Sequence, residues 1–140
     1  MFPKNENNKQ RVVTINENKI ASKLPPIKAE EYIFSRGCVR YALSSLFKIP
    51  PLDIPLEAPP GGYPILLKNM GFITFSHCKD ALFVGWSYQK IGVDIESSSR
   101  VFAANAITNR FYCEEEKQLL SSLSKQSYRQ EALKLWVLKE

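Results

Sequence analysis

The apolar positions along the chain predict a mixture of helical and extended segments. Between Ile27 and Phe47 the apolar residues recur with a helical period. The prolines at positions 25 and 26 are typical of the start of a helix. A short apolar run at residues 11–15 predicts a strand, whereas the prolines and glycines of residues 50–62 indicate a loop with little regular structure.

Three further apolar runs follow at short intervals, at residues 71–76, 82–88 and 91–96. Their connections are short enough to be hairpin turns, so the pattern predicts an antiparallel meander. After three serines the periodicity becomes helical, which predicts helices at residues 101–109, 114–123 and 128–140. The expected fold class is therefore α+β, with an antiparallel sheet packed on the long first helix.

Composition and cysteine usage narrow the class of protein. Hydrophobic residues make up 44% of the chain and aromatic residues 11%, which allows a hydrophobic core. The apolar runs are too short for a membrane span, and the first residues lack the apolar core of a signal peptide. Cys38, Cys78 and Cys113 are odd in number and form no C-x-x-C pair, so we expect a reducing, cytoplasmic location.

The positive charge is concentrated at the beginning of the chain. The formal net charge is +5, and residues 1–28, with six Lys or Arg and two Glu, carry +4 of it. The remainder is therefore nearly neutral and has no basic stripe interleaved with aromatic residues. This distribution argues against a nucleic acid as the partner.

Two carboxylates stand two residues apart in the run IGVDIE at residues 91–96. On a strand, Asp94 and Glu96 would point to the same face, where converging acids need a cation. Carboxylate oxygens suit magnesium. Glu140, at the end of the apolar stripe of the last helix, is a candidate third ligand. The alternatives are a solvated strand face for the pair and a frayed helix end for Glu140.

Several basic and hydroxyl side chains are candidates for binding phosphate. Arg36 and Arg40 are four residues apart and would share one helix face, where paired guanidinium groups suit phosphate. Ser76 and His77, at the end of a predicted strand, could form a small anion site. Lys139 could bind a pyrophosphate as a point charge, or complement the helix dipole. For the arginines the alternative is a solvated helix face, and for His77 it is a structural role.

Taken together and in order, these residues resemble the 4′-phosphopantetheinyl transferases, of the enterobactin-synthetase and surfactin-synthetase type. The resemblance covers residues 28–140 and rests on Arg36, Arg40, the FSHC run at 75–78, the Asp-x-Glu strand and the WVLKE run at 136–140. It implies the fold of that family, truncated at its C-terminus. Residues 1–24 would be a basic leader, residues 25–100 a first α+β half, and residues 101–140 the helical start of an incomplete second half.

The resemblance implies the transfer of 4′-phosphopantetheine from coenzyme A to a serine of an acyl or peptidyl carrier protein. It implies that magnesium is held by Asp94, Glu96 and Glu140, and that Glu140 or a metal-bound water takes the serine proton. Lys139 would contact the pyrophosphate during catalysis. The remaining implied contacts with coenzyme A are Arg36, Arg40, Ser76 and His77.

Two departures from the family pattern leave other interpretations open. The family's Gly-Lys-Pro element appears here as Gly62-Tyr63-Pro64, and its last helix normally continues to a further lysine. A truncated, non-catalytic remnant or fragment with a partial coenzyme A and magnesium site is therefore an alternative. A magnesium-dependent phosphoesterase is a third interpretation.

Overall fold

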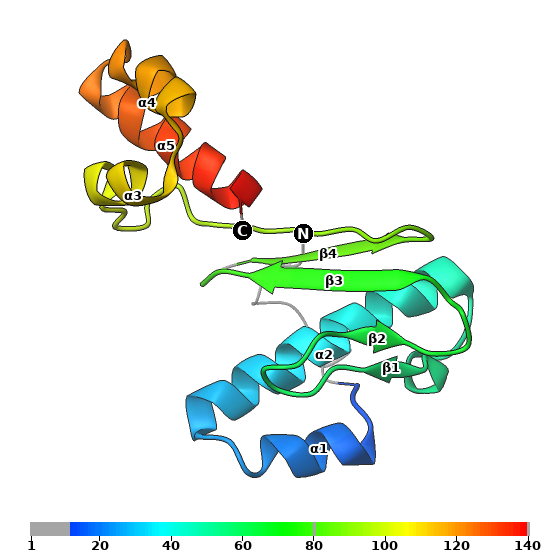
Figure 1. The fold of residues 1–140 in the computed structure, drawn as a ribbon. Helices are drawn as coiled ribbons and strands as arrows, with labels where there is room; N and C mark the ends of the chain where they lie inside the picture. Colours follow the sequence, from blue (N-terminus) through cyan, green and yellow to red (C-terminus); the bar gives the residue numbers. More distant parts are fainter. Residues whose placement is uncertain (1–11, 80, 140) are drawn as a thin grey trace. The chain divides into compact units, whose positions relative to one another are not determined.

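The computed structural model describes residues 12–79 and 81–139. These residues form α-helices and two small antiparallel sheets, which confirms the predicted α+β class. The chain divides into two compact units, Met1–Val93 and Asp94–Glu140. Figure 1 shows the sheets with α1 and α2 in the first unit, and α3, α4 and α5 in the second.

The long helix of the first unit, α2, spans Pro26–Phe47 and confirms the helix predicted there. It begins with proline at its first position, which suits the fixed φ of that residue. It ends at Lys48, whose φ of 58° is left-handed and whose N–H donates to the carbonyl oxygen of Ser44. The predicted period and the prolines at its start therefore locate this helix, and the left-handed Lys48 ends it.

The strand predicted at residues 11–15 is not formed over residues 12–15. Arg11 lies outside the residues that the structure describes. Residues 12–14 form no strand, and Ile15–Ala21 is a helix, α1. A capping box explains the difference. The Glu17 N–H donates to Thr14 Oγ1 at 3.2 Å, and the Thr14 N–H donates to the Glu17 carboxylate at 2.7 Å. This reciprocal pair of hydrogen bonds fixes the start of a helix. Its effect outweighs the β-propensity of the short run Val12, Val13 and Ile15.

The main sheet pairs β3, Phe72–His77, with β4, Leu82–Ser87, in an antiparallel register from Phe72↔Ser87 to His77↔Leu82. Both strands were predicted. The proline-rich loop holds more structure than expected: a 3-10 turn, η2 (Pro51–Asp53), and a strand, β1 (Leu56–Glu57), which pairs with β2 (Ile65–Leu66).

The third strand of the predicted meander, at residues 91–96, is not formed; the segment has no regular structure. An added Cβ at Gly85 of β4 would lie 2.6 Å from Cγ1 of Val93. Because a Cβ points out of the face of a strand, Val93 covers the face of β4 and does not lie beside its edge. Side-chain packing on a glycine thus replaces a third row of backbone hydrogen bonds.

The core of the first unit lies between α2 and the strands. Trp86 packs edge-on against Phe47, with ring centroids 5.3 Å apart, and its Nε1–H donates to the Met70 carbonyl oxygen at 2.7 Å. The packed, hydrogen-bonded indole joins the sheet to the C-terminal end of α2. The buried residues of this core are Cys38, Val39, Leu43, Ile54, Leu56, Ala58, Leu66, Ile73 and Leu82.

The second unit contains α3 (Ala104–Phe111), α4 (Glu114–Ser121) and α5 (Lys125–Lys139), so each predicted helix is present with shifted ends. Trp136 of α5 packs edge-on against Phe111 of α3, with ring centroids 5.4 Å apart. Within the described residues, we find no helix of the length and apolar character that crossing a membrane requires. The buried residues of this core are Phe102, Ala104, Tyr112, Leu120, Ala132 and Leu133.

Candidate functional site

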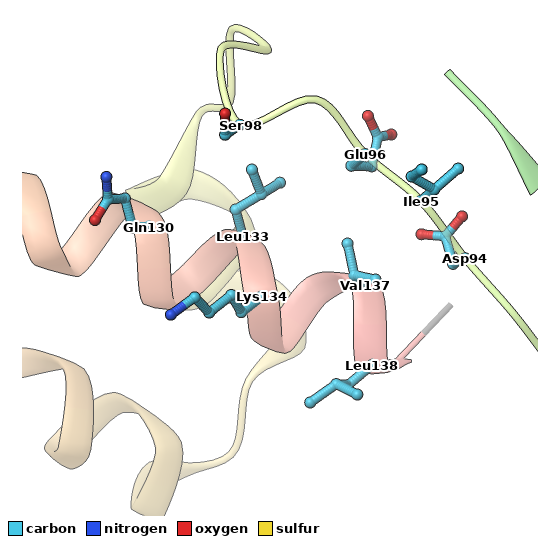
Figure 2. Close-up of a pocket in the computed structure, with 9 residues that line it drawn as sticks. All are labelled: Asp94, Ile95, Glu96, Ser98, Gln130, Leu133, Lys134, Val137 and Leu138. Atoms are coloured by element: carbon cyan, nitrogen blue, oxygen red, sulfur yellow. The ribbon is translucent and has the colours of Figure 1, made fainter. Parts of the chain in front are cut away.

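Asp94 and Glu96 begin the second unit and line one cavity of about 660 Å³. The strand expected to align them is absent, but the structure still brings both carboxyl-bearing residues to the same hollow. Both side chains are partly buried. Figure 2 shows them on the irregular segment that faces α5.

The opposite wall of this cavity is mainly apolar and comes from α5. Leu133 and Val137 project from the helix toward the segment that carries the two acids (Figure 2). Leu133 is buried and Val137 partly buried, which agrees with the apolar stripe predicted along this helix. An apolar wall reduces the solvation of a nearby carboxylate and so favours a compensating cation. Polar lining comes from Ser98, Gln130 and Lys134.

The compensating cation in the structure is a side chain that the sequence analysis did not single out. Arg100 Nη1 forms an ion pair with Glu96 Oε1. The Arg100 N–H also donates to the Ser97 carbonyl oxygen at 2.9 Å, which closes a turn between the two charged residues. The four-residue spacing of Glu96 and Arg100 was the only hint of this ion pair in the sequence. Such a spacing brings two side chains together only where the chain forms a turn or a helix, and no turn was predicted here.

Lys139 is also paired within the second unit. Its Nζ lies 2.9 Å from Oε1 of Glu116 on α4 and 5.3 Å from the centroid of the Tyr112 ring. The hydrogen bond from Lys139 holds the pKa of Glu116 below its usual value, and the bond from the Cys113 N–H acts in the same direction. The pair links α5 to α4, a role that sequence reasoning did not anticipate.

The donor set fits magnesium only in part. Two carboxylates, Asp94 and Glu96, line one cavity, and magnesium usually takes one or two carboxylates together with phosphate oxygens. Among the residues that the structure describes, no group of three His, Cys, Asp or Glu side chains could hold a metal ion. Glu140, the third expected ligand and the expected catalytic acid, lies outside the described residues.

The first unit contains a separate cavity of about 420 Å³, called the basic cavity below, whose lining holds three basic side chains and one acid, Glu31, which is paired with Lys28 at 2.9 Å. Arg36 of α2, His77 of β3 and Lys28 of α2 all line it. One rim is formed by the proline and glycine residues 59–62. The structure therefore brings together two of the predicted phosphate-binding residues, although 41 positions separate them in the sequence.

Arg36 is held firmly at this cavity but keeps donors available. Its Nε donates to the Ala58 carbonyl oxygen at 2.9 Å and its Nη1 to Ser35 Oγ at 3.2 Å. Its guanidinium lies over the rings of Tyr32 and Phe75, at 4.4 and 4.8 Å from their centroids. Burial lowers the pKa of Arg36. Since a guanidinium has five N–H donors, these bonds leave part of the fork for a ligand.

Arg40 and Ser76 are placed differently from Arg36 and His77. Arg40 is 2% exposed and donates to both carboxylate oxygens of Glu17 and to three backbone carbonyls, of residues 51, 54 and 56. These bonds use all five of its donors. Ser76 precedes His77 on β3, so its side chain points to the opposite face of the strand.

Comparison with known proteins gives one finding. Residues 90–140 match the family model of the 4′-phosphopantetheinyl transferase superfamily. No curated protein matches the chain. The matched segment contains Asp94, Glu96, Arg100 and Lys139. The basic cavity of the first unit lies outside it.

Proposed function

We propose that this protein transfers 4′-phosphopantetheine from coenzyme A to a serine of a carrier protein, and that it has the fold of the enterobactin-synthetase and surfactin-synthetase type. One observation carries the proposal. The segment that matches the superfamily contains Asp94 and Glu96, and both residues line one cavity in the second unit. A pair of carboxylates suits chemistry at a highly charged phosphate group when it holds a divalent cation, which then contacts the phosphate oxygens.

The proposed roles within the second unit follow from the donor types. Asp94 and Glu96 would hold magnesium, with Glu140 as the proposed third ligand. When bound, magnesium supplies positive charge against the charge that develops on the phosphate oxygens. Glu140 is also proposed to accept the proton of the carrier serine while the serine oxygen bonds to the β-phosphorus of coenzyme A and adenosine 3′,5′-bisphosphate leaves. For Lys139 to contact the pyrophosphate, it would have to exchange its bond with Glu116 for one with the substrate.

We further propose that the basic cavity of the first unit binds a phosphate group of coenzyme A. The support is the convergence of Arg36 and His77 on one hollow, where Lys28 is already paired with Glu31. Arg36 is restrained by two aromatic rings and two hydrogen bonds, so little rotamer entropy is lost when it binds an anion. We omit Arg40 from this proposed site, because its hydrogen bonds within the fold use all its donors.

The test is an assay with coenzyme A, magnesium and an apo carrier domain, followed by mass spectrometry of the carrier. We expect the carrier to gain the mass of one phosphopantetheine group. Asp94→Asn should abolish this gain, whereas Asp53→Asn, at an exposed acid of η2, should not change it.

Three other outcomes would contradict the proposal. Magnesium-dependent binding of coenzyme A without transfer would favour a non-catalytic remnant. Hydrolysis of a simple phosphodiester with no carrier present would favour a phosphoesterase. If Asp94→Asn still transfers phosphopantetheine, the two carboxylates are not required for the reaction.

A further inference from the structure

We propose that Arg100 is the resident counter-cation of Glu96, and that a divalent cation binding to Asp94 and Glu96 must displace its guanidinium. The inference rests on the proposed function, because the cation site is itself proposed. It goes further in assigning to Arg100 the control of how readily the site takes a cation. Glu96 then alternates between two partners, one built into the chain and one taken from solution.

The first support is the position of the ion pair. Arg100 Nη1 contacts Glu96 Oε1, and Glu96 lines the cavity that also contains Asp94. The Glu96 side chain is 21% exposed and that of Arg100 is 47% exposed, so the pair lies at the edge of the cavity. One carboxylate oxygen is thus already occupied where a metal ion would bind, and two cations cannot share it at close range.

The second support is the turn that returns Arg100 to Glu96. The Arg100 N–H donates to the Ser97 carbonyl oxygen at 2.9 Å, and Ser97 Oγ lies 2.8 Å from Ser99 Oγ. The Ser99 N–H also donates to Ser97 Oγ, at 3.3 Å. These short-range bonds close a compact turn of small polar residues. The backbone of Arg100 is therefore restrained close to the acid that its side chain contacts.

The third support is Arg129 of α5, which fastens this turn to the helix. Its guanidinium donates to the carbonyl oxygens of Ser98, at 3.3 Å, and of Arg100. Arg129 touches neither acid in these contacts, so it is a positioning residue that acts through the backbone of the turn. Two arginines thus have distinct tasks: one neutralises Glu96 and the other holds the turn that makes this possible.

The size of the effect follows from the exposure of the pair. Partly exposed ion pairs contribute little, so removing Arg100 should tighten cation binding by about two- to fivefold. The experiment titrates Mn²⁺, a paramagnetic substitute for magnesium, into the protein and measures free Mn²⁺ by electron paramagnetic resonance. Arg100→Gln should lower the Kd by this factor, whereas Arg100→Lys should keep it near that of the wild type.

The matched control is Lys117→Gln. Lys117 forms an ion pair with Glu114 in the same unit, so the variant removes one positive charge without touching the turn. We expect it to leave the Kd for Mn²⁺ unchanged. An equal tightening in Lys117→Gln and Arg100→Gln would overturn the proposal, because general electrostatics would then explain the effect.

A second readout distinguishes displacement from simple repulsion. The ¹⁵Nε resonance of Arg100 should shift when Mg²⁺ is added, toward its position in Glu96→Gln, where the pair is already broken. Arg129→Gln should move the same resonance part of the way without metal. A wild type that binds Mn²⁺ while the Arg100 resonance stays fixed would refute the counter-cation role alone. A wild type that binds no Mn²⁺, with Arg100→Gln equally inert, would instead refute the proposed cation site.

Discussion

Glu17 and Arg40 form a buried ion pair that joins α1 to α2, with Arg40 Nε 2.9 Å from Glu17 Oε2. The side chains are 7% and 2% exposed. Glu17 also accepts the bonds of the capping box at the start of α1. One carboxylate therefore fixes the start of α1 and neutralises a buried guanidinium of α2.

Arg40→Leu should destabilise the first unit by about 3–5 kcal/mol, because it leaves Glu17 as an uncompensated buried charge. Urea unfolding followed by Trp86 fluorescence measures this, in a Trp136→Phe background that removes the tryptophan of the second unit. Lys28→Ala, which breaks an exposed pair with Glu31 on α2, should change stability by only about 0–1 kcal/mol. Equal effects of the two substitutions would show that the Glu17–Arg40 pair is not structural.

Arg36→Gln and His77→Gln should each weaken the binding of coenzyme A by roughly tenfold to a hundredfold, as expected for a lost charge-assisted contact of about 1.5–3 kcal/mol. An analogue lacking the contacted phosphate, such as dephospho-coenzyme A, should bind these variants and the wild type alike. Isothermal titration calorimetry gives both affinities. Lys79→Gln, at an exposed lysine just beyond β3, is the control. Equal losses for both ligands, with a lower melting temperature, would make the two residues structural.

The bond between Lys139 and Glu116 should stabilise the second unit in a pH-dependent way. It holds the pKa of Glu116 below the ordinary 4.5. A lowered carboxyl pKa stabilises the folded state above the ordinary pKa, and this contribution is lost as the pH falls through the folded value.

Lys139→Met should therefore be less stable than the wild type at pH 7, and the difference should shrink as the pH falls below about 4.5. Trp136 fluorescence during urea unfolding, in a Trp86→Phe background, measures this difference across the pH range. Lys134→Met, which breaks the exposed pair with Glu131 on the same helix, controls for the loss of one charge. A Lys139→Met defect that stays constant from pH 7 to pH 3 would contradict the expectation.

Cys38 and Cys113 should differ in their reactivity toward an alkylating agent. Cys38 is fully buried in α2, and burial raises the pKa of its thiol to about 11. Because the thiolate is the nucleophile, Cys38 should resist iodoacetamide at pH 8 until the first unit unfolds. Cys113, exposed at the start of α4, should be alkylated in the folded protein. Mass spectrometry of timed digests checks this order, and early alkylation of Cys38 would show that the core of the first unit opens readily.

The local pattern of apolar residues and prolines was sufficient to predict most of the secondary structure. The helical period and flanking prolines located α2, the apolar runs located β3 and β4, and the last third of the chain is helical as predicted. These elements are set by interactions between near neighbours in the sequence. The sequence also indicated that Asp94 and Glu96 belong together, although the strand proposed to align them does not form.

What the sequence could not decide depended on contacts between distant segments. Arg36 and Arg40 are equivalent by spacing, yet α1 and residues 51–56 enclose Arg40, whereas Arg36 reaches a cavity that also contains His77. Residues 91–93 have the composition of a strand, but Gly85 lets Val93 pack onto the face of β4. The sequence alone determined which charged groups this protein has and which helices and strands carry most of them. Tertiary packing decided which charges are neutralised internally, because a buried charge must find a partner wherever the fold places one.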